Sequence, residues 1–288
     1  MSALGWDDPL ALARRASFAA AARGAARTII SDLDGTLAPF APTPGEARVP
    51  NGTLAALGAL VAAGWTVVIA SGRAWVEARA LVPLPGVLVF GSHGAEDERG
   101  RLLVPDAAAL AARLDELAAA ARPLLARFAG AWLERKPAGL ALHDRLLPSE
   151  TRGAWTEARE TWLAERRLEG IDACRGACVL ELRAAGFDKG LVARRTAPSA
   201  TAETSDESLV AMGDDRTDED LFAALDGRGL AVRVGEAERA SRAARRLRSP
   251  REVEEFLTAL AAAAQTGEAP RRAGFGGAAG GGASAFRA

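Results

Sequence analysis

A short apolar run that stops on two carboxylates constrains this chain more than any other feature of its sequence. Residues 28–37 read TIISDLDGTL, so Asp32 and Asp34 are separated by a single residue where the apolar run ends. Side chains alternate between the two faces of a strand, and both carboxylates are therefore expected to point the same way. Two close like charges need a shared proton or a hard cation such as Mg²⁺. The segment thus predicts a metal-dependent acidic site.

Three later segments repeat this design, because each is an apolar run that stops abruptly on polar residues. The runs and the polar residues that follow them are 66–70 with Ser71, 178–182 with Lys189, and 208–212 with Asp214. In parallel α/β sheets the carboxyl ends of the strands lie along one edge, and ligands bind at that edge. We therefore expect an α/β fold with a doubly wound parallel sheet, in which these residues converge with Asp32.

The order of the motifs resembles the haloacid dehalogenase (HAD) superfamily of phosphatases. Along the chain the motifs read D-x-D-G-T-L, S-G-R, D-K-G and G-D-D-x-T-D-E. Within the superfamily, residues 213–222 (GDDRTDEDLF) and 91–96 (GSHGAE) are similar to the trehalose-6-phosphate phosphatases. The resemblance covers residues 27–262 and implies a hydrolase of trehalose biosynthesis that takes a small sugar phosphate as its substrate. It also implies functional pairing with a trehalose-6-phosphate synthase.

The resemblance assigns a role to each catalytic candidate. It implies that Asp32 is the nucleophile and forms an aspartyl-phosphate, for which a carboxylate is a competent catalyst. Asp34 is implied to protonate the leaving sugar oxygen and later to deprotonate water, and we expect crowding of carboxylates to help it hold a proton. Ser71, at an expected helix start near Arg73, is implied to hold phosphate oxygens. Lys189 is implied to neutralise the phosphoryl group.

Mg²⁺ is the cofactor that the resemblance implies. Its expected ligands are the carboxylates of Asp32 and Asp214, the backbone carbonyl of Asp34 and water, because Mg²⁺ prefers an octahedron of oxygens. We expect Asp215 and Asp218 to order the surroundings of the metal and to position the lysine, and either is also a potential ligand. The alternative interpretation of this acidic run is a charged first helical turn that the helix dipole stabilises.

Between the serine and lysine motifs, the pattern changes to that of a smaller α+β module. The sequence predicts helices over 106–128 and 149–167, and strands over 132–136 and 139–145. An insertion of this size matches the cap domain of the family, which covers the active site and reads the sugar. The predicted division is a lead-in helix at 1–26, a core at 27–103 and 186–262, a cap at 104–185, and a disordered Gly/Ala-rich tail at 266–288.

The family's cap motifs E-x-K, H-Y-R and E-x-R-P match positions in this module. Together with residues of the core, they give the predicted substrate-binding set: Gly72, Arg73, His93, Glu134, Lys136, His143, Arg145 and Glu181. Carboxylate, imidazole and cationic side chains suit a disaccharide, because each hydroxyl both donates and accepts hydrogen bonds. The alternatives are that the cap residues are solvated strand charges and that His93 caps a loop.

Two departures from the family pattern keep other substrates open. Asp144 stands where the family prefers Tyr, and Ala184 stands where it prefers Pro. A HAD phosphatase for another glycosyl phosphate, such as sucrose 6-phosphate or a glycosyl phosphoglycerate, is therefore an alternative. A non-catalytic phospho-acceptor module is a third hypothesis. It is disfavoured because a receiver carries its acidic pair and its phosphorylated Asp on different strands, and because Asp34 is intact.

Composition bounds the remaining functions. A net charge of −1 gives no broad field that would attract nucleic acid or an anionic membrane. No apolar stretch approaches the ~20 residues that cross a bilayer. Cys174 and Cys178 are the only cysteines, with no second pair to complete a zinc site. A disulfide or a zinc site is an alternative, but two reduced thiols and a cytoplasmic protein are the favoured interpretation.

Overall fold

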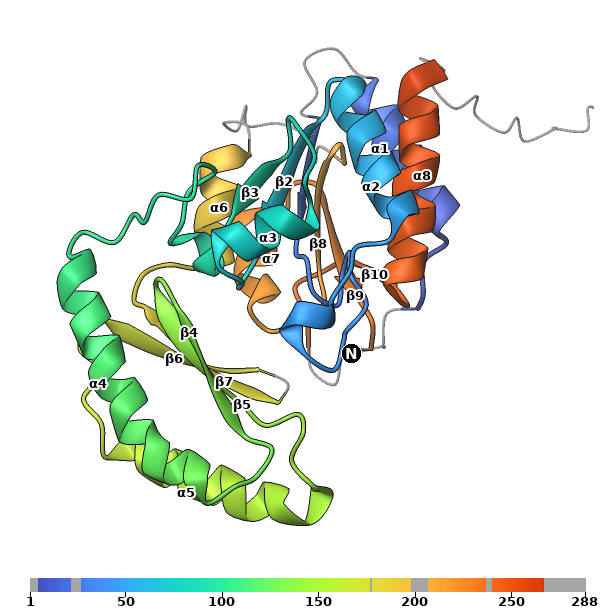
Figure 1. Cartoon of the computed structure of the whole chain (residues 1–288). Helices are drawn as coiled ribbons and strands as arrows, with labels where there is room; N and C mark the ends of the chain where they lie inside the picture. The colour runs from blue at the N-terminus through green and yellow to red at the C-terminus, as the bar shows by residue number, and fades with distance from the viewer. Residues whose placement is uncertain (1–4, 22–26, 177, 198–206, 237–239, 267–288) are drawn as a thin grey trace, which may run out of the picture.

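The computed structural model describes two layered units joined by extended connections (Figure 1). One unit is built on a parallel sheet and the other on an antiparallel sheet. The described residues are 5–21, 27–176, 178–197, 207–236 and 240–266. The predicted tail therefore lies outside the described residues, apart from residue 266.

The larger sheet is parallel throughout and has the strand order β10-β9-β8-β1-β2-β3. Its strands are β1 (Thr28–Ser31), β2 (Thr66–Ala70), β3 (Leu88–Phe90), β8 (Leu209–Gly213), β9 (Leu230–Val234) and β10 (Arg245–Leu247). Successive residues of β1 enter different apolar clusters, since Ile29 packs in one layer and Ile30 in the other. Burial of both faces explains why these strands are continuous apolar runs. The predicted doubly wound parallel sheet is confirmed.

Helices cover both faces of this sheet. One layer contains α1 (Pro9–Ala20), α2 (Asn51–Ala62), α3 (Trp75–Leu81) and α8 (Pro250–Thr266), and the other contains α6 (Lys189–Thr196) and α7 (Asp218–Ala224). In the predicted lead-in region, α1 packs against α8 (Figure 1), and Leu12 shares an apolar cluster with Phe256. The lead-in helix is therefore part of the core layer, and α8 continues four residues beyond the predicted core limit of 262.

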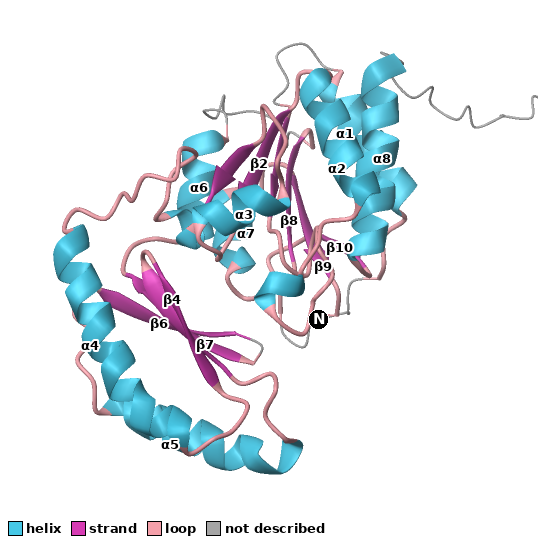
Figure 2. Ribbon diagram, in the orientation of Figure 1, coloured by secondary structure: helices cyan, strands magenta, loops and turns pink. Residues whose placement is uncertain are grey.

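The smaller sheet is antiparallel, with the order β4-β5-β7-β6. Its strands are β4 (Trp132–Lys136), β5 (Gly139–His143), β6 (Ile171–Gly176) and β7 (Val179–Ala184). One face packs on α4 (Ala107–Ala126) and α5 (Arg152–Ala164), through residues such as Leu114, Leu142 and Trp155. Figure 2 shows the other face turned toward the parallel sheet. The predicted α+β cap is thus present, with the additional strand β6.

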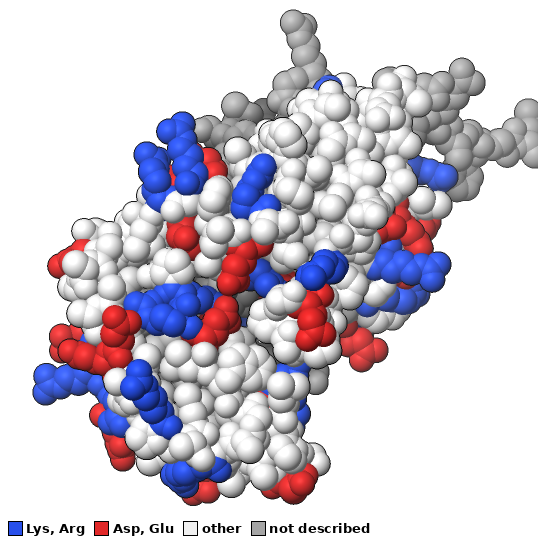
Figure 3. All heavy atoms as spheres, in the orientation of Figure 1, with Lys and Arg blue, Asp and Glu red and all other residues white. Residues whose placement is uncertain are grey.

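The surface where the two units meet carries both signs of charge. Figure 3 shows basic and acidic side chains next to one another along this boundary, which gives this face of the molecule no single-sign patch. Within the described ranges, no helix combines the length and apolar character needed to cross a membrane.

Candidate active site

The candidate site lies at the carboxyl ends of β1, β2 and β8. Asp32 follows β1 directly, and its amide donates to the carbonyl of Met212 at the end of β8, at 2.9 Å. Ser71 follows β2 in the same way. Asp32 and Ser71 are both buried. Because β1 and β2 are parallel neighbours, these two predicted residues lie at the same edge of the sheet.

Lys189 joins two of the predicted acidic residues. Its Nζ donates to Asp32 Oδ1 at 2.6 Å and to Asp218 Oδ1 at 2.7 Å, and all three side chains are buried. Lys189 is the first residue of α6, whose start is capped by the Asp188 carboxylate through the amide of Leu191. The D-K-G motif thus caps a helix and fixes the ammonium group beside Asp32.

Three carboxylates form a cluster within the described residues: oxygens of Asp32, Asp214 and Asp218 all lie within 4.8 Å of one another. Burial raises the pKa of Asp32 to about 7, although the charge of Lys189 lowers it. Burial and the charge of Asp32 raise the pKa of Asp214 to about 9. Carboxyl groups that resist ionising side by side are the environment that a hard cation with oxygen ligands relieves. The donor set therefore fits Mg²⁺.

Two residues of the D-G-T segment support this cluster, and the sequence interpretation gave them no role in it. Thr36 Oγ1 donates to Asp214 Oδ1 at 3.3 Å and lies 3.5 Å from Asp32 Oδ2. Gly35 has a φ of +85°, and a Cβ at this position would lie 2.3 Å from Asp214 Oδ2. Glycine is required because it lets the loop approach Asp214 closely. The sequence signal for this arrangement was the position of Gly35 and Thr36 directly after the two carboxylates.

Asp32 and Asp34 both lie beyond the end of β1, so the expectation that strand alternation orients their side chains was wrong. The strand ends at Ser31, so the alternation of a strand no longer governs residue 34. The Asp34 carboxylate instead accepts two hydrogen bonds from Arg73, 2.6 Å from Nε and 2.7 Å from Nη2. Arg73 also donates to the Pro44 carbonyl. Arg73, predicted to bind substrate, is in this state bound to Asp34.

Ser71 does not begin a helix. The helix α3 begins at Trp75, with Ala74 as its N-cap, whereas Ser71 Oγ accepts a hydrogen bond from the amide of Arg73 within the preceding turn. The Arg73 carbonyl accepts from the amide of Ser92, which keeps residues 71–74 out of the helical ladder. The expectation of a helix start at Arg73 is therefore wrong, and the Ser71 hydroxyl lies in the turn at the strand end.

Asp218 and Asp215 differ in position. Asp218 Oδ2 accepts from the backbone amides of Asp214 and Asp215, each at 2.9 Å, while its Oδ1 holds the lysine. It therefore fixes both the loop and the ammonium group. The Asp215 carboxylate is directed at the β6–β7 hairpin, because a Cβ added to Gly176 would lie 3.1 Å from its Oδ2.

The cap contacts the core through Glu181 and Lys136. Glu181 Oε2 lies 2.7 Å from His93 Nε2, and Glu181 Oε1 accepts from Lys136 Nζ at 2.5 Å. Lys136 Nζ also donates to the Gly72 carbonyl at 3.0 Å. A Cβ on Gly72 would lie 2.7 Å from the ring of His93, so only glycine lets the imidazole approach. Four predicted substrate-binding residues are thus brought together across the interface.

Two further predicted residues pair on the same face of the cap sheet. Glu134 Oε2 lies 2.7 Å from His143 Nε2 and 4.0 Å from Lys136 Nζ. The His143 ring stacks on Trp132, with centroids 4.6 Å apart. These contacts extend the polar cluster from Glu181 across β4 and β5.

Arg145 lies apart from this cluster. Its Nη1 donates to the Ala41 carbonyl at 2.9 Å, and its guanidinium lies 4.9 Å from the centroid of the Phe40 ring. Phe40, a residue that sequence reasoning missed, is the partner of Arg145 in the core. Such a contact joins residues far apart in the sequence and has no local signature.

The two departures from the family pattern belong to the cap core. Asp144 is buried and accepts from Trp155 Nε1 at 2.8 Å and from Arg159 Nη1 at 3.1 Å. Ala184 is buried in the apolar cluster beneath α4 and α5. Neither side chain is part of the polar cluster, and their identities therefore say little about substrate.

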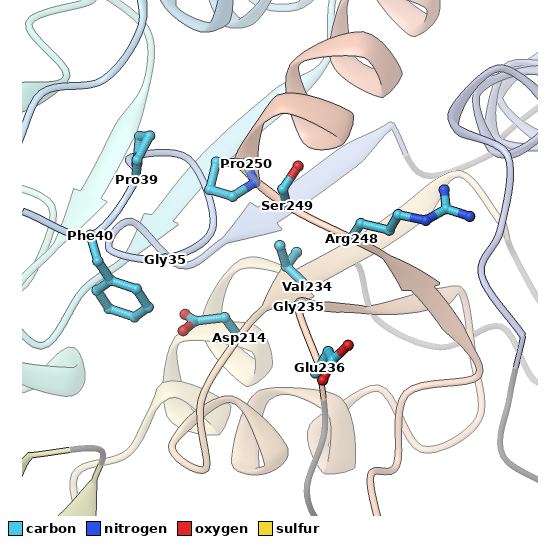
Figure 4. Close-up of a pocket in the computed structure, with 10 residues that line it drawn as sticks. All are labelled: Gly35, Pro39, Phe40, Asp214, Val234, Gly235, Glu236, Arg248, Ser249 and Pro250. Atoms are coloured by element: carbon cyan, nitrogen blue, oxygen red, sulfur yellow. The ribbon is translucent and has the colours of Figure 1, made fainter.

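Asp214 also lines a cavity of about 310 Å³ (Figure 4). Its walls come from the loops that follow β1, β8, β9 and β10. The lining residues are Gly35, Pro39, Phe40, Asp214, Val234, Gly235, Glu236, Arg248, Ser249 and Pro250.

Comparison with solved structures supports the fold. The C-terminal domain of Candida albicans trehalose-6-phosphate phosphatase superposes with a TM-score of 0.76 and 21% identity, covering 91% of this chain and 99% of that one. A haloacid dehalogenase-like hydrolase from Bacteroides thetaiotaomicron superposes with a TM-score of 0.56 and 17% identity, covering 81% of this chain and 98% of that one. At these identities the likeness establishes the HAD fold alone.

Comparison of sequences supports the family. A trehalose-phosphate phosphatase of Mycobacterium marinum is 33% identical over 279 residues, which cover 92% of this chain and 66% of that protein. The chain spans 66% of the length of this relative and of its counterpart from Mycobacterium ulcerans. The family model described as trehalose-phosphatase matches residues 30–251. The resemblance seen in the motifs is confirmed, and the chain belongs to the trehalose-phosphatase family.

Proposed function

We propose that this chain is a Mg²⁺-dependent phosphatase that hydrolyses trehalose 6-phosphate to trehalose and phosphate. The observation that carries the proposal is the buried contact of Lys189 with Asp32, beside the cluster that includes Asp214. A fixed cation and hard-cation ligands around one buried carboxylate suit attack on a phosphorus atom. Family membership supports the sugar, which is carried over from longer relatives.

Asp32 is the proposed nucleophile. One of its oxygens forms a bond to phosphorus, while the bond from phosphorus to the sugar oxygen breaks and its electron pair stays on that oxygen. Asp34 donates the proton that this oxygen takes up. A water molecule then attacks the aspartyl-phosphate, Asp34 accepts its proton, and phosphate leaves with the Asp32 carboxylate restored.

Asp34 has to be released from Arg73 before it transfers a proton to the leaving oxygen. Both of its oxygens accept hydrogen bonds from the guanidinium in this state. Arg73 is a natural partner for phosphate oxygens, because a guanidinium binds them in pairs. Binding of the substrate phosphate would therefore draw Arg73 away from Asp34 and free the carboxyl group for proton transfer.

Two cations neutralise the negative charge of the phosphoryl group in this proposal. Lys189 supplies a fixed positive charge at Asp32. Mg²⁺ would be held by Asp32, Asp214 and the backbone carbonyl of Asp34, and when bound it offsets repulsion between phosphate and carboxylate. Ser71, whose hydroxyl lies at the neighbouring strand end, is the proposed hydrogen-bond partner of a phosphate oxygen.

The polar face of the cap is the proposed sugar-reading surface. Glu134, Lys136, His143 and Glu181 converge on this face, with Gly72 and His93 opposite them in the core. We propose the core as residues 27–103 and 186–262 and the cap as residues 104–185, and functional pairing with a trehalose-6-phosphate synthase. The two residues that kept another glycosyl phosphate open as the substrate, Asp144 and Ala184, are buried in the cap core. They therefore give little reason to prefer that alternative to trehalose 6-phosphate.

The test is phosphate release with Mg²⁺ from trehalose 6-phosphate, sucrose 6-phosphate, glucose 6-phosphate and an aryl phosphate, with Asp32→Asn as the control. Preference for trehalose 6-phosphate that the variant abolishes supports both reaction and sugar. Activity on other esters alone rejects the sugar, and absence of all activity rejects the phosphatase in favour of the phospho-acceptor hypothesis.

A further inference from the structure

We infer that the cavity beside Asp214 binds one pyranose ring of the substrate, with the ring of Phe40 as its stacking platform. The inference rests on the proposed phosphatase function, since it assigns a place to a sugar ring of the ester that Asp32 attacks. It adds a sugar subsite in the core, separate from the polar face of the cap.

Phe40 presents its ring to solvent at the cavity. It is 59% exposed, although it belongs to the segment after β1 that also carries the catalytic carboxylates Asp32 and Asp34. Figure 4 shows its ring directed toward the Asp214 side chain across the cavity. An exposed aromatic ring beside a polar site offers a flat apolar surface to a ligand that has both apolar and polar faces.

Arg145 holds the ring of Phe40 in position. Its guanidinium lies 4.9 Å from the ring centroid, and the same group donates to the carbonyl of Ala41, the residue next to Phe40. These two contacts tie the loop to the cap and restrict the ring before any ligand binds. Arg145 therefore serves the sugar through Phe40 as a positioning residue.

The lining of the cavity suits a neutral polyol and disfavours a second anion. Apolar surface comes from Pro39, Val234 and Pro250, whereas carboxylate oxygens come from Asp214 and Glu236. Among the described residues of the lining, Arg248 is the one cation; it pairs with Glu252 at 2.7 Å, and Figure 4 shows its guanidinium turned away from the cavity. Carboxylates accept hydrogen bonds from sugar hydroxyls, while the C–H face of a pyranose matches an aromatic ring.

The volume and the position of the cavity both favour a single sugar ring as its ligand. A volume of about 310 Å³ lies at the lower end of the range for small-molecule pockets and suits a single ring better than a disaccharide. Asp214 belongs both to this cavity and to the carboxylate cluster, so a ring bound here lies next to the phosphorus position. The other ring of the disaccharide is then left to the polar face of the cap at Lys136 and Glu181.

The test compares Phe40→Ala with Phe40→Tyr, which keeps the ring, and with Val76→Ala, which removes an exposed apolar side chain elsewhere in the core. For Phe40→Ala, we expect KM for trehalose 6-phosphate to rise about tenfold, with kinetics unchanged on a small phosphate ester that carries no ring, such as glycerol phosphate. The Tyr variant and the Val76 variant should stay near the unmodified protein. An unchanged KM in Phe40→Ala overturns the inference.

Calorimetric titration with trehalose gives a readout without turnover. We expect Phe40→Ala to raise the Kd for trehalose about tenfold and Phe40→Tyr to leave it unchanged. Equal Kd values in all variants, or no binding of trehalose by the unmodified protein, overturn the sugar subsite. Loss of the proposed function is seen separately, as absence of phosphate release from trehalose 6-phosphate by the unmodified protein.

Discussion

The core and cap halves of the site hold their charges differently. In the core, Lys189 and its partners Asp32 and Asp218 are almost fully buried and are joined by hydrogen bonds of 2.6 and 2.7 Å. In the cap, Glu181 lies 2.7 Å from His93 of the core, and Lys136 donates to the Gly72 carbonyl of the core at 3.0 Å, so both contacts cross the interface between the units. The core contacts are fixed by the fold of one unit, whereas the cap contacts depend on two units meeting.

This difference implies a division of labour. Groups fixed inside one unit keep their geometry for every substrate, which suits the transfer of a phosphoryl group. Groups at an interface can separate and close again, which suits admission of a substrate and exclusion of water. Variants of the buried carboxylates and lysine of the core should therefore affect all phosphate esters alike, and variants at the polar face of the cap should affect only esters that carry the sugar.

The largest expected effect is that of Asp32→Asn. Asparagine keeps the shape of the side chain but cannot form the aspartyl-phosphate, so kcat should fall on the order of 10⁴-fold or more for all esters. Steady-state kinetics on trehalose 6-phosphate and on an aryl phosphate measure this loss. A variant that loses only one of the two activities would contradict the division between core and cap.

Lys189→Met should lower both activity and stability. Removal of one fixed donor to the phosphoryl group is expected to reduce kcat about 10² to 10³-fold. Loss of the ammonium group leaves Asp32 and Asp218 without their buried counter-charge, which costs about 3 to 5 kcal/mol of unfolding free energy. Urea unfolding measures the second effect, and Lys189→Met combined with Asp218→Asn should recover part of the stability without activity, because one of the two unpaired carboxylates is then neutral. Full stability in the single variant would show that the pair is not buried as described.

Lys136→Ala should act on the sugar alone. Loss of a charged hydrogen-bond donor is expected to raise KM for trehalose 6-phosphate about 10 to 100-fold, with little change for an aryl phosphate. Arg135→Ala is the matched control, because Arg135 is next to it on β4 but contacts Asp115 of α4. Equal losses on both esters would mean that Lys136 supports the core and does not read sugar.

Sequence patterns predicted the core well because its chemistry lies at the ends of buried strands. The run 66–70 coincides with β2, and parallel topology brings Ser71 to the edge that holds Asp32. The direction of the Asp34 side chain could not be derived from strand alternation, because a period of two does not reveal where a strand stops. The chain leaves β1 at Ser31, and the pairing of Asp34 with Arg73 arises from the turn that follows.

The cap was less accessible to sequence reasoning. The strand β6 (Ile171–Gly176) was missed because it alternates weakly and buries only Ile171. The Arg145 motif was recognised, but its partner Phe40 lies more than 100 residues away in the sequence. Local patterns assign a residue to a strand face, whereas the partner across an interface is decided by how the two units pack.

The smallest expected effect is a pH dependence at the cap–core contact. Burial lowers the pKa of His93 from its ordinary value of 6.5, against the attraction of Glu181, and its buried Nδ1 has no hydrogen-bond partner among the described residues. Below pH 6.5 the unfolded chain protonates this histidine, whereas the folded chain keeps it neutral. The stability that the neutral His93 contact contributes is therefore full above pH 6.5 and is lost as pH falls below it. Urea unfolding between pH 7.5 and 5.5 should show a steeper loss in the unmodified protein than in His93→Gln, by at most about 1.4 kcal/mol per pH unit for one proton. The carboxylates at Asp32 and Asp214 titrate in both proteins and cancel in this difference. Identical slopes would mean that the contact between cap and core carries no proton linkage at His93.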